Sequence, residues 1–111
     1  MEPSKNRELT IKCLHKAVLE MMSFEWHQEV ANLPETERKE ASLRAMKCFN
    51  AKDKLVNAQL KDIRDKLEQN EDALTTERKK LEDALKDLKQ VKDILEAASS
   101  LLSVVAKVVT L

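Results

Sequence analysis

Leucine recurs at every seventh position through the second half of the chain, and this is the strongest pattern in the sequence. A second column lies three positions further on and is mostly apolar, interrupted by the polar residues Asn70 and Glu77. Such a heptad repeat is typical of helices that pack along an apolar seam. The leucine column consists of Leu60, Leu67, Leu74, Leu81, Leu88, Leu95 and Leu102, and Val109 continues it.

The first third of the chain has the spacing of a helix that is apolar over a wide face. Pro34 interrupts this pattern, because the residue before a proline disfavours helical geometry and proline itself suits the first turn of a new helix. We therefore predict a helix over about residues 4–33, a corner at 33–35 and a second helix that folds back on the first. The apolar positions are Ile11, Leu14, Val18 and Met21 on one stripe and Leu19, Met22, Trp26, Val30 and Leu33 on the next.

Two architectures fit the region after Pro34. In the first, the chain turns near residues 70–76, where Asn70 can end one helix and Asp72 or Thr75 can cap another. This predicts one all-α domain over residues 1–111, an elongated antiparallel bundle of three long helices (about 4–33, 35–69 and 76–111) with coiled-coil-like heptads. In the second, the heptad register is unbroken, and one continuous helix from residue 35 onward forms the long arm of a helical hairpin.

Composition supports the all-α class and bears on the partner. The 111 residues include no Gly, no Tyr, two Pro and few aromatic residues, which disfavours strand-rich folds. Twenty basic and twenty acidic residues give a formal net charge of zero, whereas nucleic-acid binders usually carry a basic face. The longest basic cluster is Arg78, Lys79 and Lys80, which we interpret as a solvated helix face. We therefore expect no nucleic-acid partner.

The chain ends in ILEAASSLLSVVAKVVTL, residues 94–111, where only Glu96 and Lys107 are charged. The uncharged stretch between them is shorter than the roughly twenty residues of a membrane-spanning helix. Lys107 and the serines give only a weak polar face for lying on a membrane surface. We therefore expect this helix to be buried against other helices, of this chain, of a second copy or of another helical protein. The residues expected to make the contact are Leu88, Val91, Leu95, Leu102, Val105 and Val109.

Few residues are placed to carry chemistry. His15 and His27 are the only histidines, and neither has a Glu three positions before it, as the helical di-iron motif requires. A chain without Gly has no Gly-rich phosphate loop. The corner at Pro34 would bring His15 near Asp53, which we interpret as an ion pair at the helix boundary. We therefore predict no enzyme activity, no metal and no cofactor.

Sulfur-containing and aromatic side chains are expected in the interior. Cys13 and Cys48 would lie about 10 Å apart along the hairpin axis, too far for a disulfide bond, so both are expected to pack between helices. Five large side chains are expected to form a core cluster near the corner, although a methionine-rich surface can also be a groove for a partner. These five are Met21, Met22, Trp26, Met46 and Phe49.

The N-terminus, MEPSKNRELT, lacks the apolar core of a cleavable signal peptide. We therefore expect a cytoplasmic location, with secretion by another route left open.

The sequence favours a function in protein contact. We expect a non-enzymatic interaction or assembly module (a scaffold, adaptor or small regulator). It would act through the leucine column and the apolar C-terminal helix, by self-association or with another helical protein. The alternative is a membrane-active helical protein, such as a toxin component or lipid-surface binder, that inserts its C-terminal segment.

Overall fold

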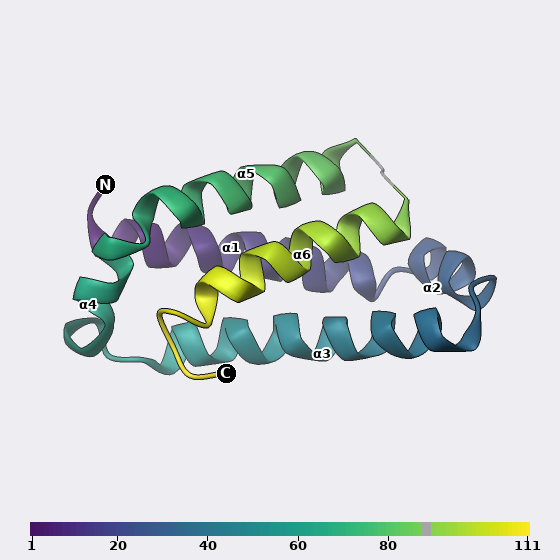
Figure 1. The fold of residues 1–111 in the computed structure, drawn as a ribbon, viewed down its shortest axis with the longest axis horizontal. Helices are drawn as coiled ribbons and strands as arrows, with labels where there is room; N and C mark the ends of the chain where they lie inside the picture. Colours follow the sequence, from purple (N-terminus) through teal and green to yellow (C-terminus); the bar gives the residue numbers. More distant parts are fainter. Residues whose placement is uncertain (88–89) are drawn as a thin grey trace.

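The longer helices run along the molecule, and the shorter ones lie at its ends (Figure 1). The computed structural model describes residues 1–87 and 90–111, in a body of 44 × 24 × 18 Å. The described residues contain no strand, so the predicted all-α class is confirmed. The longer helices are α1 (Pro3–Met21), α3 (Glu35–Asn57), α5 (Glu71–Lys86) and α6 (Val91–Val105), and the short ones are α2 (Phe24–Ala31) and α4 (Leu60–Gln69).

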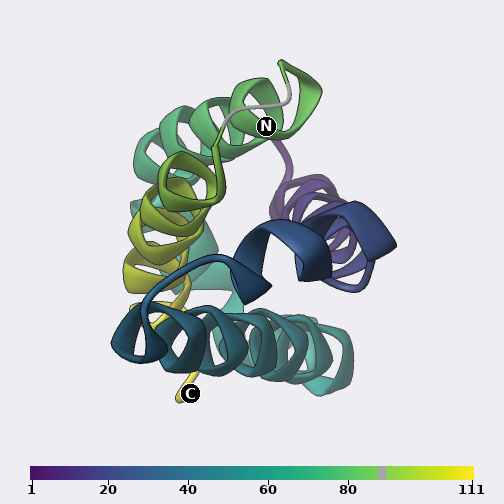
Figure 2. The same cartoon turned by 90° about the vertical axis from the view of Figure 1, so that its right-hand side faces the viewer.

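The order of the longer helices around the bundle differs from their order in the chain (Figure 2). Both α1 and α6 pack against α3 and α5, so the ring runs α1, α3, α6, α5. α1 is antiparallel to α3, and α5 is antiparallel to α6, whereas α3 and α6 run in the same direction. The chain therefore passes diagonally from α3 to α5. α4 makes this passage at one end of the bundle, and α2 joins α1 to α3 at the other.

The predicted bundle of three long helices is not confirmed, because residues 1–87 and 90–111 form six shorter helices. The alternative of one continuous helix from residue 35 is wrong, since α3 ends at Asn57 and α4 begins at Leu60. Ser23 divides the helix predicted over residues 4–33, because its hydroxyl accepts a hydrogen bond of 3.1 Å from the Trp26 amide and caps α2. Within the turn predicted at 70–76, only Asn70 lies between α4 and α5.

The break between α3 and α4 contains no residue that favours a turn. Ala58 and Gln59 are both extended, with ψ of 139° and 132°. The Ala58 carbonyl accepts a hydrogen bond of 2.7 Å from the guanidinium of Arg7 on α1. A carbonyl at a helix end needs a donor from elsewhere. A residue far away in the sequence therefore stabilises this break.

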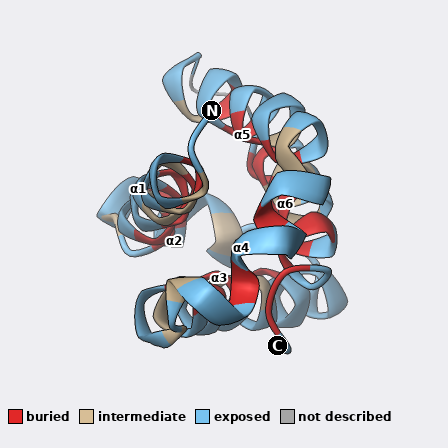
Figure 3. Ribbon diagram, turned by 90° about the vertical axis from the view of Figure 1, so that its left-hand side faces the viewer, coloured by how far each residue is buried: buried red, intermediate tan, exposed pale blue. Residues whose placement is uncertain are grey.

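One apolar core fills the space between the longer helices, which turn their buried faces toward each other (Figure 3). Members of the leucine column reach this core from α4, α5 and α6 in turn. Their seven-residue spacing thus reflects core positions on separate helices instead of a seam along one helix. The buried members are Leu67, Leu74, Leu81 and Leu102, while Leu60 and Leu95 are partly buried against the same core.

A buried polar cluster joins α1, α4 and α5. Arg78 on α5 is only 5% exposed, and its Nη1 donates to the Asn6 side-chain oxygen and, at 2.9 Å, to the Thr10 hydroxyl. The Asn6 amide group donates in turn to the Leu67 carbonyl at 3.1 Å. That carbonyl lies in the last turn of α4, where intrahelical partners run out. One cluster on α1 therefore fixes the positions of both α4 and α5.

Arg78 is buried among neutral acceptors and forms no ion pair within the part of the chain that the structure describes. Burial lowers the pKa of the Arg78 guanidinium from its ordinary value, because the charged form loses water. An arginine nevertheless keeps its proton in proteins. The interpretation of residues 78–80 as a solvated face is therefore wrong for Arg78, although Lys79 and Lys80 are exposed.

Cys13 and Cys48 lie in the core as free thiols. Burial raises the pKa of Cys13 to about 12 and that of Cys48 to about 11. Because the thiolate is the reactive form, we expect iodoacetamide at neutral pH to alkylate the native protein only as fast as it unfolds. The denatured protein should be alkylated at both thiols without this delay. Mass spectrometry over time measures both rates, and rapid alkylation of the native protein would contradict the burial.

The same thiols should make stability depend on alkaline pH. Their folded pKa values lie above the ordinary value of 9.0, so their contribution to the free energy of unfolding is complete below pH 9.0. It is lost as the pH rises through 11 to 12, because the unfolded state releases its thiol protons first. We expect the free energy of unfolding of the Cys13→Ala variant to fall less steeply with rising alkaline pH than that of the original chain. Urea titrations at a series of pH values measure this dependence.

Candidate interaction surface

The six residues predicted to contact a partner lie mainly inside the bundle. Leu95 is partly buried, Leu88 lies outside the described residues, and the other four are buried in the core. The C-terminal helix packs against α5 and α3, so the buried members of this set lie inside the folded chain. The four buried residues are Val91, Leu102, Val105 and Val109.

Within residues 1–87 and 90–111, no helix combines the length and hydropathy required to span a bilayer.

The five side chains predicted to form a core cluster divide into two groups. Met21 and Trp26 are buried. In contrast, Met22 is 68% exposed, Met46 62% and Phe49 47%. The core interpretation is therefore wrong for these three residues, which lie on the surface of the bundle.

α3 meets the bundle mainly with small side chains. Residues two apart on a helix point about 200° away from each other, so Met46 lies on the face opposite Cys48. Three of the four buried residues of this helix are small, and most of its large apolar side chains (Leu43, Met46, Phe49 and Val56) lie on the outside, whereas Leu55 is buried. The buried residues of α3 are Ala41, Cys48, Ala51 and Leu55.

Two grooves flank Met46 on the outside of the bundle. One lies between α1 and α3, has a volume of about 300 Å³ and is lined by Met22 and Phe49 among other residues. The other lies between α3 and α6, has a volume of about 570 Å³ and includes Leu43 and Leu111. Met46 lines both grooves, so the apolar surface is continuous across α3. We name its exposed side chains Met22, Leu43, Met46 and Phe49 the methionine face.

The methionine face has the properties of a contact surface. Contiguous exposed apolar patches on a soluble chain commonly mark sites of interaction. Methionine is flexible and polarizable, so it adapts to the shape of a bound surface. The Lys52 ammonium lies 5.0 Å from the centre of the Phe49 ring, a cation–π contact that helps to hold the ring at the edge of the face.

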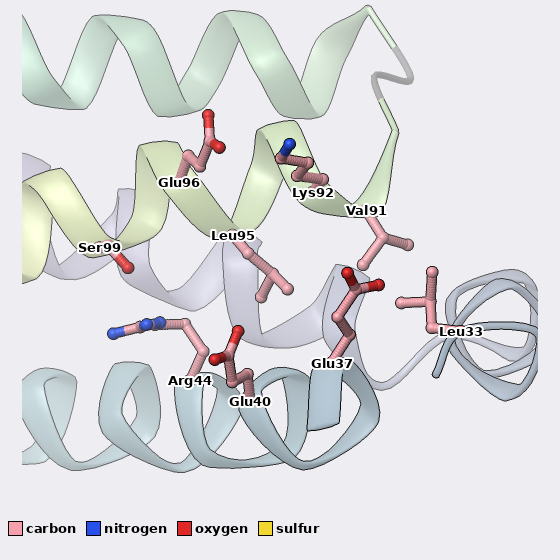
Figure 4. A pocket seen from close by; sticks show the side chains of 9 residues that line it. All are labelled: Leu33, Glu37, Glu40, Arg44, Val91, Lys92, Leu95, Glu96 and Ser99. Carbon is pink, nitrogen blue, oxygen red and sulfur yellow. The ribbon is translucent and has the colours of Figure 1, made fainter. Parts of the chain in front are cut away.

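A third cavity, of about 190 Å³, lies between the first halves of α3 and α6 (Figure 4). Leu95 points from α6 toward α3, and Leu33 and Val91 lie near one end. Charges of both signs surround it, so it offers no field of one sign to select a charged ligand. Arg44 and Ser99 line both this cavity and the larger α3–α6 groove, which it therefore extends. Its other lining residues are Glu37, Glu40, Lys92 and Glu96.

The polar residues singled out in the sequence do not form a reactive site. His15 is exposed, and among the described residues no ion pair joins it to Asp53, so the predicted pair is absent. The hairpin pairing behind that prediction is nevertheless correct, because Met22 and Met46 line one groove. The described part of the chain holds no group of three His, Cys, Asp or Glu side chains arranged to bind a metal ion.

One signal in the sequence indicates the exposure of the methionine face. Met46 and Asp53 extend the leucine column toward the N-terminus. An unpaired carboxylate is costly to bury, so Asp53 indicates that this end of the column faces outward. The heptad repeat does not reveal this exposure, because it is recognised from the spacing of apolar residues alone.

Comparisons of the chain with protein families, with curated proteins and with solved structures find no match. A proposal for its function therefore has to rest on the surface itself.

Proposed function

We propose that this protein is a non-enzymatic protein–protein interaction or assembly module that binds its partner through the methionine face. The observation that carries the proposal is the exposure of Leu43, Met46 and Phe49 on α3 and of Met22 at the C-terminal cap of α1. Covering such side chains is favourable by roughly 25 cal/mol per Å² of apolar surface removed from water. The proposal keeps the class of function expected from the sequence and moves the contact to a different surface.

The shape of the methionine face suits a helical partner. Met46 and its neighbours form a ridge along α3, with a groove of about 300 Å³ on one side and of about 570 Å³ on the other. Helices pack when the side-chain ridges of one lie in the grooves of the other. An amphipathic helix of the partner can therefore lie on α3 and place apolar side chains in both grooves. A scaffold, an adaptor or a small regulator would each use such a contact.

The membrane-active alternative would require the C-terminal segment to leave the core. Ile94, Leu101, Val105 and Val108 are all at most 3% exposed. Inserting them into lipid would empty the centre of the bundle, whereas a protein partner can bind the methionine face without any unfolding. We therefore favour the protein partner.

A photo-crosslinking side chain at position 46 tests the proposal. Met46 is largely exposed at the centre of the face, so p-benzoylphenylalanine there should be tolerated and should contact whatever covers α3. We expect irradiation in cells of the source organism to give a discrete adduct, which mass spectrometry can identify.

The control carries the same side chain at position 80. Lys80 is exposed on α5, diagonally across the bundle from α3, and should give no discrete adduct. The proposal fails when position 46 gives no adduct, or when both positions give the same products.

A further inference from the structure

We propose that the partner at the methionine face is a second copy of this chain, with α3 packed antiparallel to α3 of the other copy about a two-fold axis at Met46. This inference rests on the proposed function and adds the identity of the partner. It is carried by the symmetry of the exposed face of α3, first in its apolar centre and then in its charges.

The apolar centre of the face is symmetric about Met46. On one side of a helix, the neighbours of a residue lie three, four and seven positions away. Leu43 and Phe49 lie three positions on either side of Met46, and both are exposed apolar side chains. Ser42 and Asn50 lie four positions away, and both are exposed and uncharged. An antiparallel copy therefore brings only apolar and uncharged polar side chains together at these positions around the axis.

The charges at the ends of the face are complementary. Lys39 and Asp53 lie seven positions on either side of Met46, at about 10 Å along the helix, and have opposite charge. A two-fold axis at Met46 brings Lys39 of each copy to Asp53 of the other, so the pair forms twice. Within the described chain, Asp53 forms no ion pair, and Lys39 contacts only the exposed Glu35, at 3.3 Å. Both charges are therefore available to a second copy.

Methionine suits the axis itself. A residue on a two-fold axis meets its own copy, so it has to be compatible with itself, and two methionines adapt to each other without a charge or a rigid ring between them. Leu43 of one copy then lies at the same level along the contact as Phe49 of the other, on the two flanks of α3 where the grooves lie. The antiparallel arrangement also brings each α3 N-terminus toward the C-terminus of the other, which is favourable for the two helix dipoles.

The proposed interface is small. Lys39 and Asp53 are about 21 Å apart along α3, and contacts of this size belong to the weak, transient class. We expect a dissociation constant in the micromolar range, about 1 to 100 μM.

Charge reversal across the axis tests the inference by sedimentation velocity. Lys39→Asp places Asp opposite Asp53 twice, and Asp53→Lys places Lys opposite Lys39 twice. We expect the full chain to dimerise between about 1 and 500 μM, and each variant alone to dimerise roughly 10- to 100-fold more weakly at low salt. Mixing the two variants should restore the original affinity, because both contacts in the mixed dimer join opposite charges again.

The matched controls are Lys61→Asp and Asp65→Lys, the same charge changes at exposed positions of α4. They should leave the dimer unchanged, and circular dichroism should show that all four variants remain folded. A wild-type chain that stays monomeric, a dimer insensitive to the reversals at 39 and 53, or a mixture that fails to reassociate would each overturn the inference.

The cross-link at position 46 separates this inference from the proposed function. An adduct with a second copy supports both. An adduct with another protein, from a chain that is monomeric when purified, overturns the second copy and leaves the interaction module intact. No adduct together with a monomeric chain overturns both.

Discussion

Replacing Arg78 by alanine is expected to lower the free energy of unfolding by about 3 kcal/mol, because it leaves buried acceptors without their donor. The Asn6 side-chain oxygen loses its charged hydrogen bond, and the Thr10 hydroxyl loses a donor at 2.9 Å. Lys79→Ala, one position away on the exposed side of α5, should change stability by less than about 0.5 kcal/mol. Urea denaturation followed by circular dichroism measures both values.

A double-mutant cycle assigns the loss to the contact itself. Thr10→Val removes the hydroxyl that accepts from Arg78. When the contact stabilises the fold, Thr10→Val and Arg78→Met together should cost less than the sum of the single changes, by about 1 kcal/mol. Additive effects, or equal losses for Arg78→Ala and Lys79→Ala, would show that Arg78 does not join α1 to α5.

Leu74→Ala should lower the free energy of unfolding by about 3 kcal/mol, whereas Leu95→Ala should lower it by only about 1 kcal/mol. Both leucines belong to the same heptad column. Leu74 is 1% exposed in the core, while Leu95 is partly buried beside the cavity between α3 and α6. Truncating a fully enclosed side chain removes more contacts and leaves a larger void than truncating one beside an existing cavity.

The shift of the urea midpoint at an unchanged slope measures this difference. The comparison also tests the fold. One leucine seam along a continuous helix would make the two positions nearly equivalent, so equal losses would contradict the separate roles of α5 and α6. A larger loss at Leu74 is expected when each helix contributes to the core independently.

Helix boundaries show how far sequence reasoning reaches. Pro34 marks the corner before α3 because its own ring restricts the backbone, and that restriction is local. The break at Ala58 and Gln59 has no such marker, since neither residue favours a turn. There the backbone leaves the helix where Arg7 of α1 supplies a donor to the Ala58 carbonyl. The Arg7 side chain reaches that carbonyl only when α1 lies beside it.

The residues predicted to contact a partner differ from the apolar residues that the structure leaves exposed. Apolar spacing identifies residues that avoid water, but it does not say whether another helix of the same chain or a partner covers them. The C-terminal residues Val105 and Val109 proved to be core, whereas Met22, Met46 and Phe49 proved to be surface. The C-terminal residues are buried because α6 packs against both α3 and α5. Met46 and Phe49 are exposed because α3 packs against the bundle mainly through small side chains.

The sequence by itself determined the all-α class, since a chain rich in helix formers and without Gly has few ways to build strands or tight turns. It also determined the corner at Pro34 and the balance of charge. Only the tertiary structure decided which helices are neighbours, and with them the burial of Arg78, the break at Ala58 and the exposure of the methionine face. These features join or separate residues far apart in the chain, as Arg78 and Asn6 are. Local propensity and periodicity act over a few turns of helix, so they cannot specify contacts at that range.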